Sequence, residues 1–282
     1  MCGFFRESES ASLGSLNVTI IGDIFSGKER GLAMGYNASA ISIGTASYPA
    51  VGGLLASVSW NYPFFLSILA LPVGLAVLFG LENIEPQKNN NFKIYFKNAL
   101  SSILKKDVLS IYAITFLFFV ILYGSILTYT PILLKNKFGS PSHQIGILLS
   151  AMSIAMGIAA TQTGRISTRF KPAMIVFIVS CMYLFVLLLI PILPTIYLIL
   201  LPLLLYGFAN GMLLPALQTT LAGKASLEER GMFMSLNGMV LRFGQTIGPL
   251  ITGLAFTFGI EWAFWSSMVV VLLIMMLSRF VK

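Results

Sequence analysis

The sequence predicts an all-α, polytopic membrane protein, and both its composition and its charge spacing support this fold class. Hydrophobic residues make up 57% of the 282 residues and charged residues only 10%, less than half of the roughly 25% that is usual in soluble domains. No Asp, Glu, Lys or Arg occurs in four long runs: residues 31–81, 108–134, 138–164 and 172–223. A transmembrane helix needs about 20 apolar residues, so every run is long enough to cross a bilayer.

Helix-breaking residues divide the longer runs into single spans. Pro191 and Pro194 interrupt residues 172–223, and Trp60-Asn61-Tyr62-Pro63 interrupts residues 31–81, because proline halts a helix and marks a turn. The sequence therefore predicts eight full transmembrane helices, near residues 32–58, 62–81, 108–134, 144–163, 173–190, 196–222, 232–257 and 262–279. A ninth, partial helix near residues 11–22 is too short to cross alone.

The distribution of basic residues predicts the topology. When alternate loops are assigned to alternate sides, fourteen Lys and Arg residues fall on one side and only Lys135 and Lys137 on the other. By the positive-inside rule the side with fourteen is cytoplasmic, which places the C-terminus there and predicts a multi-pass protein of the cell (plasma) membrane. The net charge of +8 thus reflects topology, and we expect the lipid bilayer, not nucleic acid, as the partner.

Cysteine labelling would test this topology. In a background without Cys2 and Cys181, a membrane-impermeant reagent added outside is expected to modify a cysteine at position 135 and to miss one at position 89, because only the first loop lies outside. The reverse pattern of labelling would overturn the orientation.

An internal repeat divides the chain into two related parts. With an offset of 200 residues, ten of the 37 positions from 29 to 65 are identical to those from 229 to 265, including Glu29-Arg30-Gly31 and Pro49. Parallel repeats of helices are a known transporter architecture. We therefore expect residues 1–81 to be part of one six-helix bundle (part of helix four, then helices five and six), residues 82–107 a cytoplasmic linker, and residues 108–282 a complete second bundle. The counterparts of helices one to three are absent, which predicts a truncated chain.

Two motifs stand out in the sequence. The first contains Gly35, Gly44, Pro49, Gly52 and Gly53, with Tyr48 before the proline, and the second runs from Gly164 to Phe170. Together they resemble the major facilitator superfamily, most closely its drug/proton antiporter branch. The first is similar to the antiporter signature of helix five, with Tyr48 where the family usually has Gly, and the second to the loop between helices eight and nine, with Thr168 in place of the usual Asp. Small residues four apart let helices approach closely in lipid.

The resemblance implies a function and a set of site residues. It implies a secondary transporter, a small-molecule or multidrug efflux permease with protons as a possible coupling ion, although the predicted full spans hold no deep carboxylate. We expect the truncated chain to be inactive, and a non-transporting remnant of a broken gene or a metabolite/sugar uptake permease stays as an alternative. The resemblance also implies gating-loop residues, namely Asp23, Arg30, Gly164, Arg165 and Arg169.

Arg242 is the one ionisable residue deep inside a predicted full span, and an intramembrane charge is by default a functional hypothesis. On a helical wheel, Ser235 and Thr246 lie within about 40° of Arg242 and Gln245 within about 60°, so this face of the helix is polar. The resemblance implies that it faces a substrate cavity; a structural ion pair or hydrogen bond is the alternative. Asn210 and Tyr123, at similar depth in other spans, are further substrate-cavity candidates, with bonding to a neighbouring helix as the alternative.

No grouping of His, Cys or carboxylates suggests catalysis or metal binding, and no Gly-rich phosphate loop occurs. We therefore expect no enzyme activity, no cofactor and no metal site.

Overall fold

The computed structural model of the protein describes residues 27–80, 103–225 and 229–281, and these residues are all-helical, with no strand among them. The predicted partial helix near 11–22 and most of the linker, residues 82–107, lie outside the described residues. The first part of the chain forms α2 (Gly27–Val58), followed by α3 (Tyr62–Phe65), η1 (Leu66–Leu69) and α4 (Ala70–Gly80). The remainder forms α6 (Lys106–Ile121), η2 (Leu122–Tyr129), α7 (Thr130–Phe138), α8 (Ser142–Arg169), α9 (Pro172–Ile192), α10 (Ile196–Lys224), α11 (Arg230–Phe256) and α12 (Trp262–Ser278).

Each of the eight predicted full spans coincides with a helix or with a run of adjoining helices. Within the described residues, five stretches are long and apolar enough to cross a membrane: Lys106–Phe138, Ser142–Thr163, Pro172–Ile192, Ile196–Lys224 and Gly231–Phe256. The other three, Ile43–Val58, Tyr62–Ala76 and Trp262–Ser278, are shorter apolar helices. The turns fall where the sequence places helix breakers, because α9 ends just before Leu193-Pro194 and α3 begins beside Pro63.

The stretch Lys106–Phe138 contains a π-helical segment, η2, between α6 and α7. Two threonine hydroxyls bond to carbonyls five residues earlier: Thr128 Oγ1 donates to the Tyr123 oxygen at 2.6 Å and Thr130 Oγ1 to the Ser125 oxygen at 3.5 Å. The Ser125 oxygen also accepts the backbone N–H of Thr130, which is the five-residue bond of a π-helix. Pro131 follows in the first turn of α7, where a missing N–H costs least.

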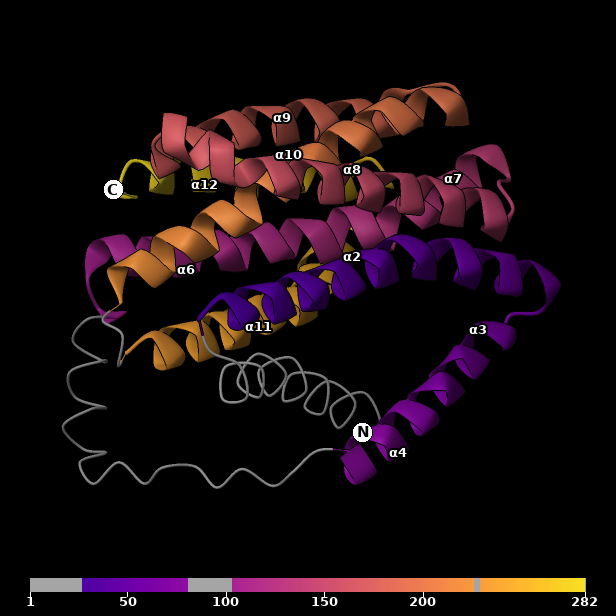
Figure 1. Cartoon of the computed structure of the whole chain (residues 1–282). Coiled ribbons are helices and arrows are strands. Elements are labelled where there is room, and N and C mark those ends of the chain that lie inside the picture. Colours follow the sequence, from indigo (N-terminus) through magenta and orange to yellow (C-terminus); the bar gives the residue numbers. More distant parts are fainter. Residues whose placement is uncertain (1–26, 81–102, 226–228, 282) are drawn as a thin grey trace.

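The helices of residues 103–281 form a bundle around a buried apolar core (Figure 1). α10 packs along α8 and α9, α12 packs against α9 and α6, and α11 packs against α6 and η2. The closest approach is between α8 and α10, where Gly207 and Gly211 leave no room for a Cβ atom: it would meet the Met152 oxygen at the first position and the Met156 oxygen at the second. Glycine is required there because backbone contacts backbone.

The helices of residues 27–80 are covered unevenly. α2 packs along α8, and a Cβ atom at Gly53 would lie 2.6 Å from the Ser142 oxygen. Beyond α2, the chain of α3, η1 and α4 runs away from the bundle (Figure 1). Large apolar side chains on it are mostly exposed: the exposed fractions of Phe64, Leu71 and Phe79 are 59%, 66% and 88%. This surface is apolar enough to face lipid or further helices.

Candidate substrate-binding site

Arg242 lies in the middle of α11, on the face that the bundle does not cover. Its Nη1 donates a hydrogen bond of 3.3 Å to Oε1 of Gln245, one turn away. Both side chains are half-buried, while Ser235 and Thr246 on the same face are exposed. The Thr246 hydroxyl donates to the Arg242 backbone oxygen at 3.1 Å. Only 17% of the most apolar stretch of α11 is buried, against 61% for the stretch Lys106–Phe138, so the described helices leave most of α11 uncovered.

The opposite face of α11 carries the packing contacts. A Cβ atom at Gly244 would lie 2.6 Å from the Phe116 oxygen, and one at Gly248 would lie 2.7 Å from the Val120 oxygen. Asn237 on this face is also buried, with 4% of its surface exposed. The small residues thus fix α11 against α6 and η2, and this contact turns Arg242 and Gln245 away from the bundle core.

Tyr123 lies on an element that packs against α11. It is the second residue of η2. Its ring is stacked on Phe119, with centroids 6.1 Å apart and planes at 23°. The structure therefore joins two of the four candidate cavity residues, Arg242 and Gln245, by a hydrogen bond and places a third, Tyr123, on an element that packs against the same helix.

Asn210 lies elsewhere, inside the bundle. It is 2% exposed, and it stands one turn from Tyr206, whose ring stacks on Tyr183 of α9 at 4.7 Å between centroids. Its Oδ1 atom has no hydrogen-bond partner within the part of the chain that the structure describes. Asn210 is thus buried in the bundle, and no hydrogen bond from it to a neighbouring helix is seen among the described residues.

The helix-five motif is only partly engaged in packing. At Pro49 the backbone oxygen lies against Gly146 of α8, next to the contact of Gly53. At Gly52 a Cβ atom would meet nothing within 4 Å, and at Gly44 it would meet only the Tyr48 ring at 3.8 Å. The motif thus presents two faces, one packed on α8 and one without a neighbour among the described helices. Gly35 belongs to α2, but the structure does not describe its surroundings.

The gating-loop candidates fall largely outside the described side chains. Asp23 precedes the described residues, and Arg30, Gly164 and Arg165 are described only as helical backbone. Arg169 is exposed at the end of α8. Sequence patterns do not single out Asp107. Its carboxylate forms an ion pair with Lys224, with 2.6 Å between Oδ2 and Nζ, and this contact links the start of α6 to the end of α10. The one feature of the sequence that could have indicated Asp107 is its position directly before the charge-free run 108–134.

The described residues hold no cluster of three or more His, Cys, Asp or Glu that could bind a metal ion.

Comparison with protein families identifies the chain's relatives. The family model for the "Major Facilitator Superfamily" matches twice, over residues 10–141 and 131–282. The multidrug resistance protein MdtG of Enterobacter lignolyticus is 30% identical over 212 residues, which cover 72% of this chain and 50% of that protein. Multidrug resistance protein 1 of Bacillus subtilis is 27% identical over 261 residues, which cover 87% of this chain and 63% of that protein. The chain thus spans half to two thirds of these relatives' length.

Solved structures agree with this fold. The human organic anion transporter MFSD10 (TETRAN) superposes with a TM-score of 0.65 at 20% identity, covering 94% of this chain and 67% of that chain. A bacterial homologue of the lysosomal transporter Spinster, in an inward-facing and occupied conformation, gives a TM-score of 0.63 at 15% identity and covers 71% of that chain. At such identities the likeness concerns the fold alone.

Proposed function

Because the chain belongs to the major facilitator superfamily, we propose that it supplies the second helical bundle, and part of the first, of a secondary transporter that exports small molecules. The fold is the incomplete major-facilitator fold that the sequence predicts. Its multidrug resistance relatives support export as the direction and small molecules as the cargo. In this proposal residues 108–282 form one bundle, and residues 1–81 belong to the other.

The polar face of α11 carries the proposal. An arginine in a membrane-spanning helix costs at least about 2.5–3.5 kcal/mol at the bilayer centre on insertion scales. Such residues therefore face a bundle interior or a watery cavity. The described helices cover the opposite face, at Gly244 and Gly248, so a cavity is the environment that suits Arg242 and Gln245. A cation beside an amide and a phenol favours an anionic or polar aromatic substrate group.

A closed cavity requires more helices than the structure describes. In the repeat, Gly44 and Tyr48 correspond to Gly244 and Gly248. The second pair packs on α6 and η2, whereas Tyr48 is 58% exposed and Gly44 lies against no other helix among those that the structure describes. A helix equivalent to Lys106–Phe138 would cover the first pair. We therefore propose that transport needs helices beyond these 282 residues.

Reconstitution in liposomes tests both parts of the proposal. One preparation holds the 282-residue chain. The other holds this chain preceded by the N-terminal helices of the Bacillus relative that the match does not cover, and it is called the extended chain below. A panel of anionic, neutral and cationic dyes is loaded, and their movement is followed under a proton gradient.

We expect the extended chain to move dyes and the 282-residue chain to match empty liposomes. Export by the 282-residue chain alone would contradict the need for further helices. An extended chain that folds but moves none of the dyes would contradict the export function.

A further inference from the structure

The helix α7 is held less firmly than the segment before it. It lies at the end of the bundle opposite the C-terminus (Figure 1), and it packs mainly on η2, the segment that directly precedes it in the chain. Its buried side chains, Thr130, Leu133 and Leu134, all lie near its beginning. The residues from Lys135 to Lys137 are exposed. The second half of α7 therefore has little packing to keep it in place.

The π-helical segment η2, in contrast, is fixed to two helices. The Ser125 hydroxyl donates to the Ala263 oxygen at 2.6 Å and lies 2.6 Å from the Ser267 hydroxyl, both in α12. A Cβ atom at Gly124 would lie 3.0 Å from the Gly248 oxygen of α11. Backbone thus lies against backbone on one side of η2, and buried hydrogen bonds hold the other side.

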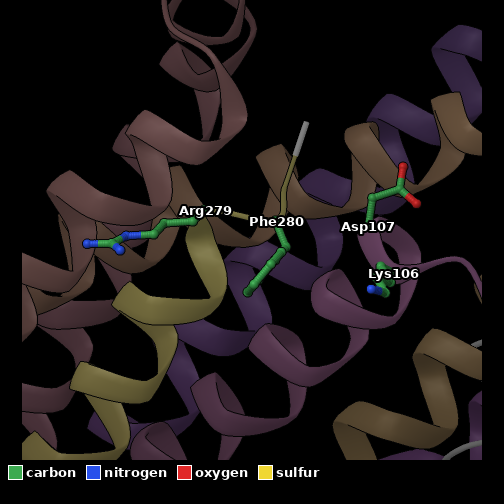
Figure 2. A pocket seen from close by; sticks show the side chains of 4 residues that line it. All are labelled: Lys106, Asp107, Arg279 and Phe280. Carbon is green, nitrogen blue, oxygen red and sulfur yellow. The ribbon is translucent and has the colours of Figure 1, made fainter.

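The far end of the same membrane-spanning stretch is also tied, at the start of α6. There Oδ2 of Asp107 accepts a hydrogen bond of 2.6 Å from Lys224 at the end of α10. Figure 2 shows that the carboxylate of Asp107 points away from Phe280 and Arg279, the residues that follow α12. The stretch Lys106–Phe138 is therefore held at its start and in its middle, and α7 is the part that remains.

The junction between η2 and α7 favours bending. Pro131 lies in the first turn of α7, and it has no N–H to donate to the preceding turn. Sharp bends in helices occur at prolines and at π-helical segments, and here the two adjoin. Gly139, which follows α7, has a φ of 63°, a conformation that glycine adopts without strain. Only residues 139–141 connect α7 to α8, so the bend allows a small tilt of α7.

Lys137 ties the second half of α7 to the end of α9. Its Nζ donates to the backbone oxygens of Pro191 at 2.7 Å and Leu193 at 3.0 Å. The last carbonyls of a helix have no partner within it, and the helix dipole favours a cation at this end. Within the described part of the chain, these are the hydrogen bonds that join α7 to a helix outside its own stretch. Because Lys137 is exposed, water can replace these bonds when they break.

We propose that Lys137 is a latch, which keeps α7 closed on the end of α9, and that α7 opens about η2 when its two hydrogen bonds break. In the open form the buried face of α7, with Leu133 and Leu134, becomes accessible. Local openings of this kind occur in equilibrium with the native state, and the population of the open form sets how fast a buried group reacts. The proposal concerns the motion of one helix and does not depend on transport.

Thiol labelling of a buried cysteine measures the opening. Leu134→Cys, in a background without Cys2 and Cys181, places a thiol on a face that is 0% exposed, and the purified chain is treated with a maleimide in detergent. Adding Lys137→Met is expected to raise the labelling rate by about 10-fold or more, because a hydrogen bond from a charged group shifts an equilibrium by at least about that factor. Lys137→Arg keeps the charge and the donors, so the rate should stay within about threefold of the parent.

Two controls distinguish a latch from a general loosening of the bundle. Lys135→Met removes an exposed lysine of the same helix and should leave the labelling rate of Leu134→Cys unchanged. Ile121→Cys places a thiol that is buried just before η2, and it should react slowly in every variant. Leu133→Cys, at a position that is 1% exposed, serves if Leu134→Cys does not fold. An unchanged rate in Lys137→Met, an equal rise in Lys135→Met, or an equal rise at Ile121→Cys would each overturn the proposal.

Discussion

Replacing Arg242 with alanine in the extended chain is expected to lower dye transport by about 10- to 100-fold. A hydrogen bond to a charged group contributes about 1.5–3 kcal/mol, and the guanidinium is the one full charge that the structure places at mid-depth on the uncovered face of α11. The loss should be largest for anionic dyes, because the Coulomb attraction between the guanidinium and an anion is strong in a cavity of low dielectric. Initial rates across the panel measure both the size and the charge dependence of the effect.

The same variant also tests the structural alternative. Arg242 donates to Gln245 on its own helix, and the packing of α11 depends on Gly244 and Gly248 on the other face. We therefore expect the thermal unfolding midpoint of Arg242→Ala to stay within a few degrees of the parent. Arg242→Lys keeps the charge and should keep most transport of anionic dyes. Unchanged transport with a clearly lower midpoint would mean that Arg242 serves the fold and not the substrate.

Replacing Gly207 or Gly211 with alanine is expected to produce the largest loss of stability among the glycine variants. At Gly207 the added methyl group would overlap the Met152 oxygen and lie 2.9 Å from the same carbonyl carbon. At Gly211 it would overlap the Met156 oxygen and lie 2.8 Å from the Ala159 Cβ. Overpacking of this kind costs about 1–3 kcal/mol. Because backbone cannot give way as a side chain can, we expect the upper part of this range.

Gly223→Ala is the matched control, because it lies in the same helix and its added methyl would meet nothing within 4 Å. Alanine in a helix is favoured over glycine by about 0.5–1 kcal/mol, so this variant should be neutral or slightly more stable. Thermal unfolding followed by circular dichroism measures all three variants. A Gly207→Ala midpoint equal to that of Gly223→Ala would show that α8 and α10 are not in backbone contact.

The spans could be predicted because charge and proline mark their ends. The predicted helix at 262–279 matches α12, and the one at 196–222 matches α10, since Pro194 precedes it and Lys224 ends it. The sequence also predicts a polar face on α11 around Arg242, because the 3.6-residue period of a helix is enough to separate it from Gly244 and Gly248.

What the sequence could not predict depends on tertiary packing. Asn210 and Tyr123 have similar depth and polarity, yet Asn210 is enclosed beside Tyr206 while Tyr123 lies next to α11. The charge distribution predicts that Lys137 lies on the outer side. Its Nζ also donates hydrogen bonds to two backbone oxygens at the end of α9, those of Pro191 at 2.7 Å and Leu193 at 3.0 Å. No local pattern distinguishes these outcomes, because each depends on which helix becomes the neighbour.

The π-helical segment η2 has a consequence for how this protein is compared with its relatives. A helix that changes from α to π and back to α shifts the direction of every later side chain relative to a continuous α-helix. The segment begins at Leu122 and ends at Tyr129, so a helical wheel drawn through all of Lys106–Phe138 assigns the residues of α7 to the wrong side. In a relative that lacks one residue here, the side chains before the segment would keep their directions, and the side chains after it would point to a different side of the helix. Aligning the two helices without a gap would then match lipid-facing positions with buried ones.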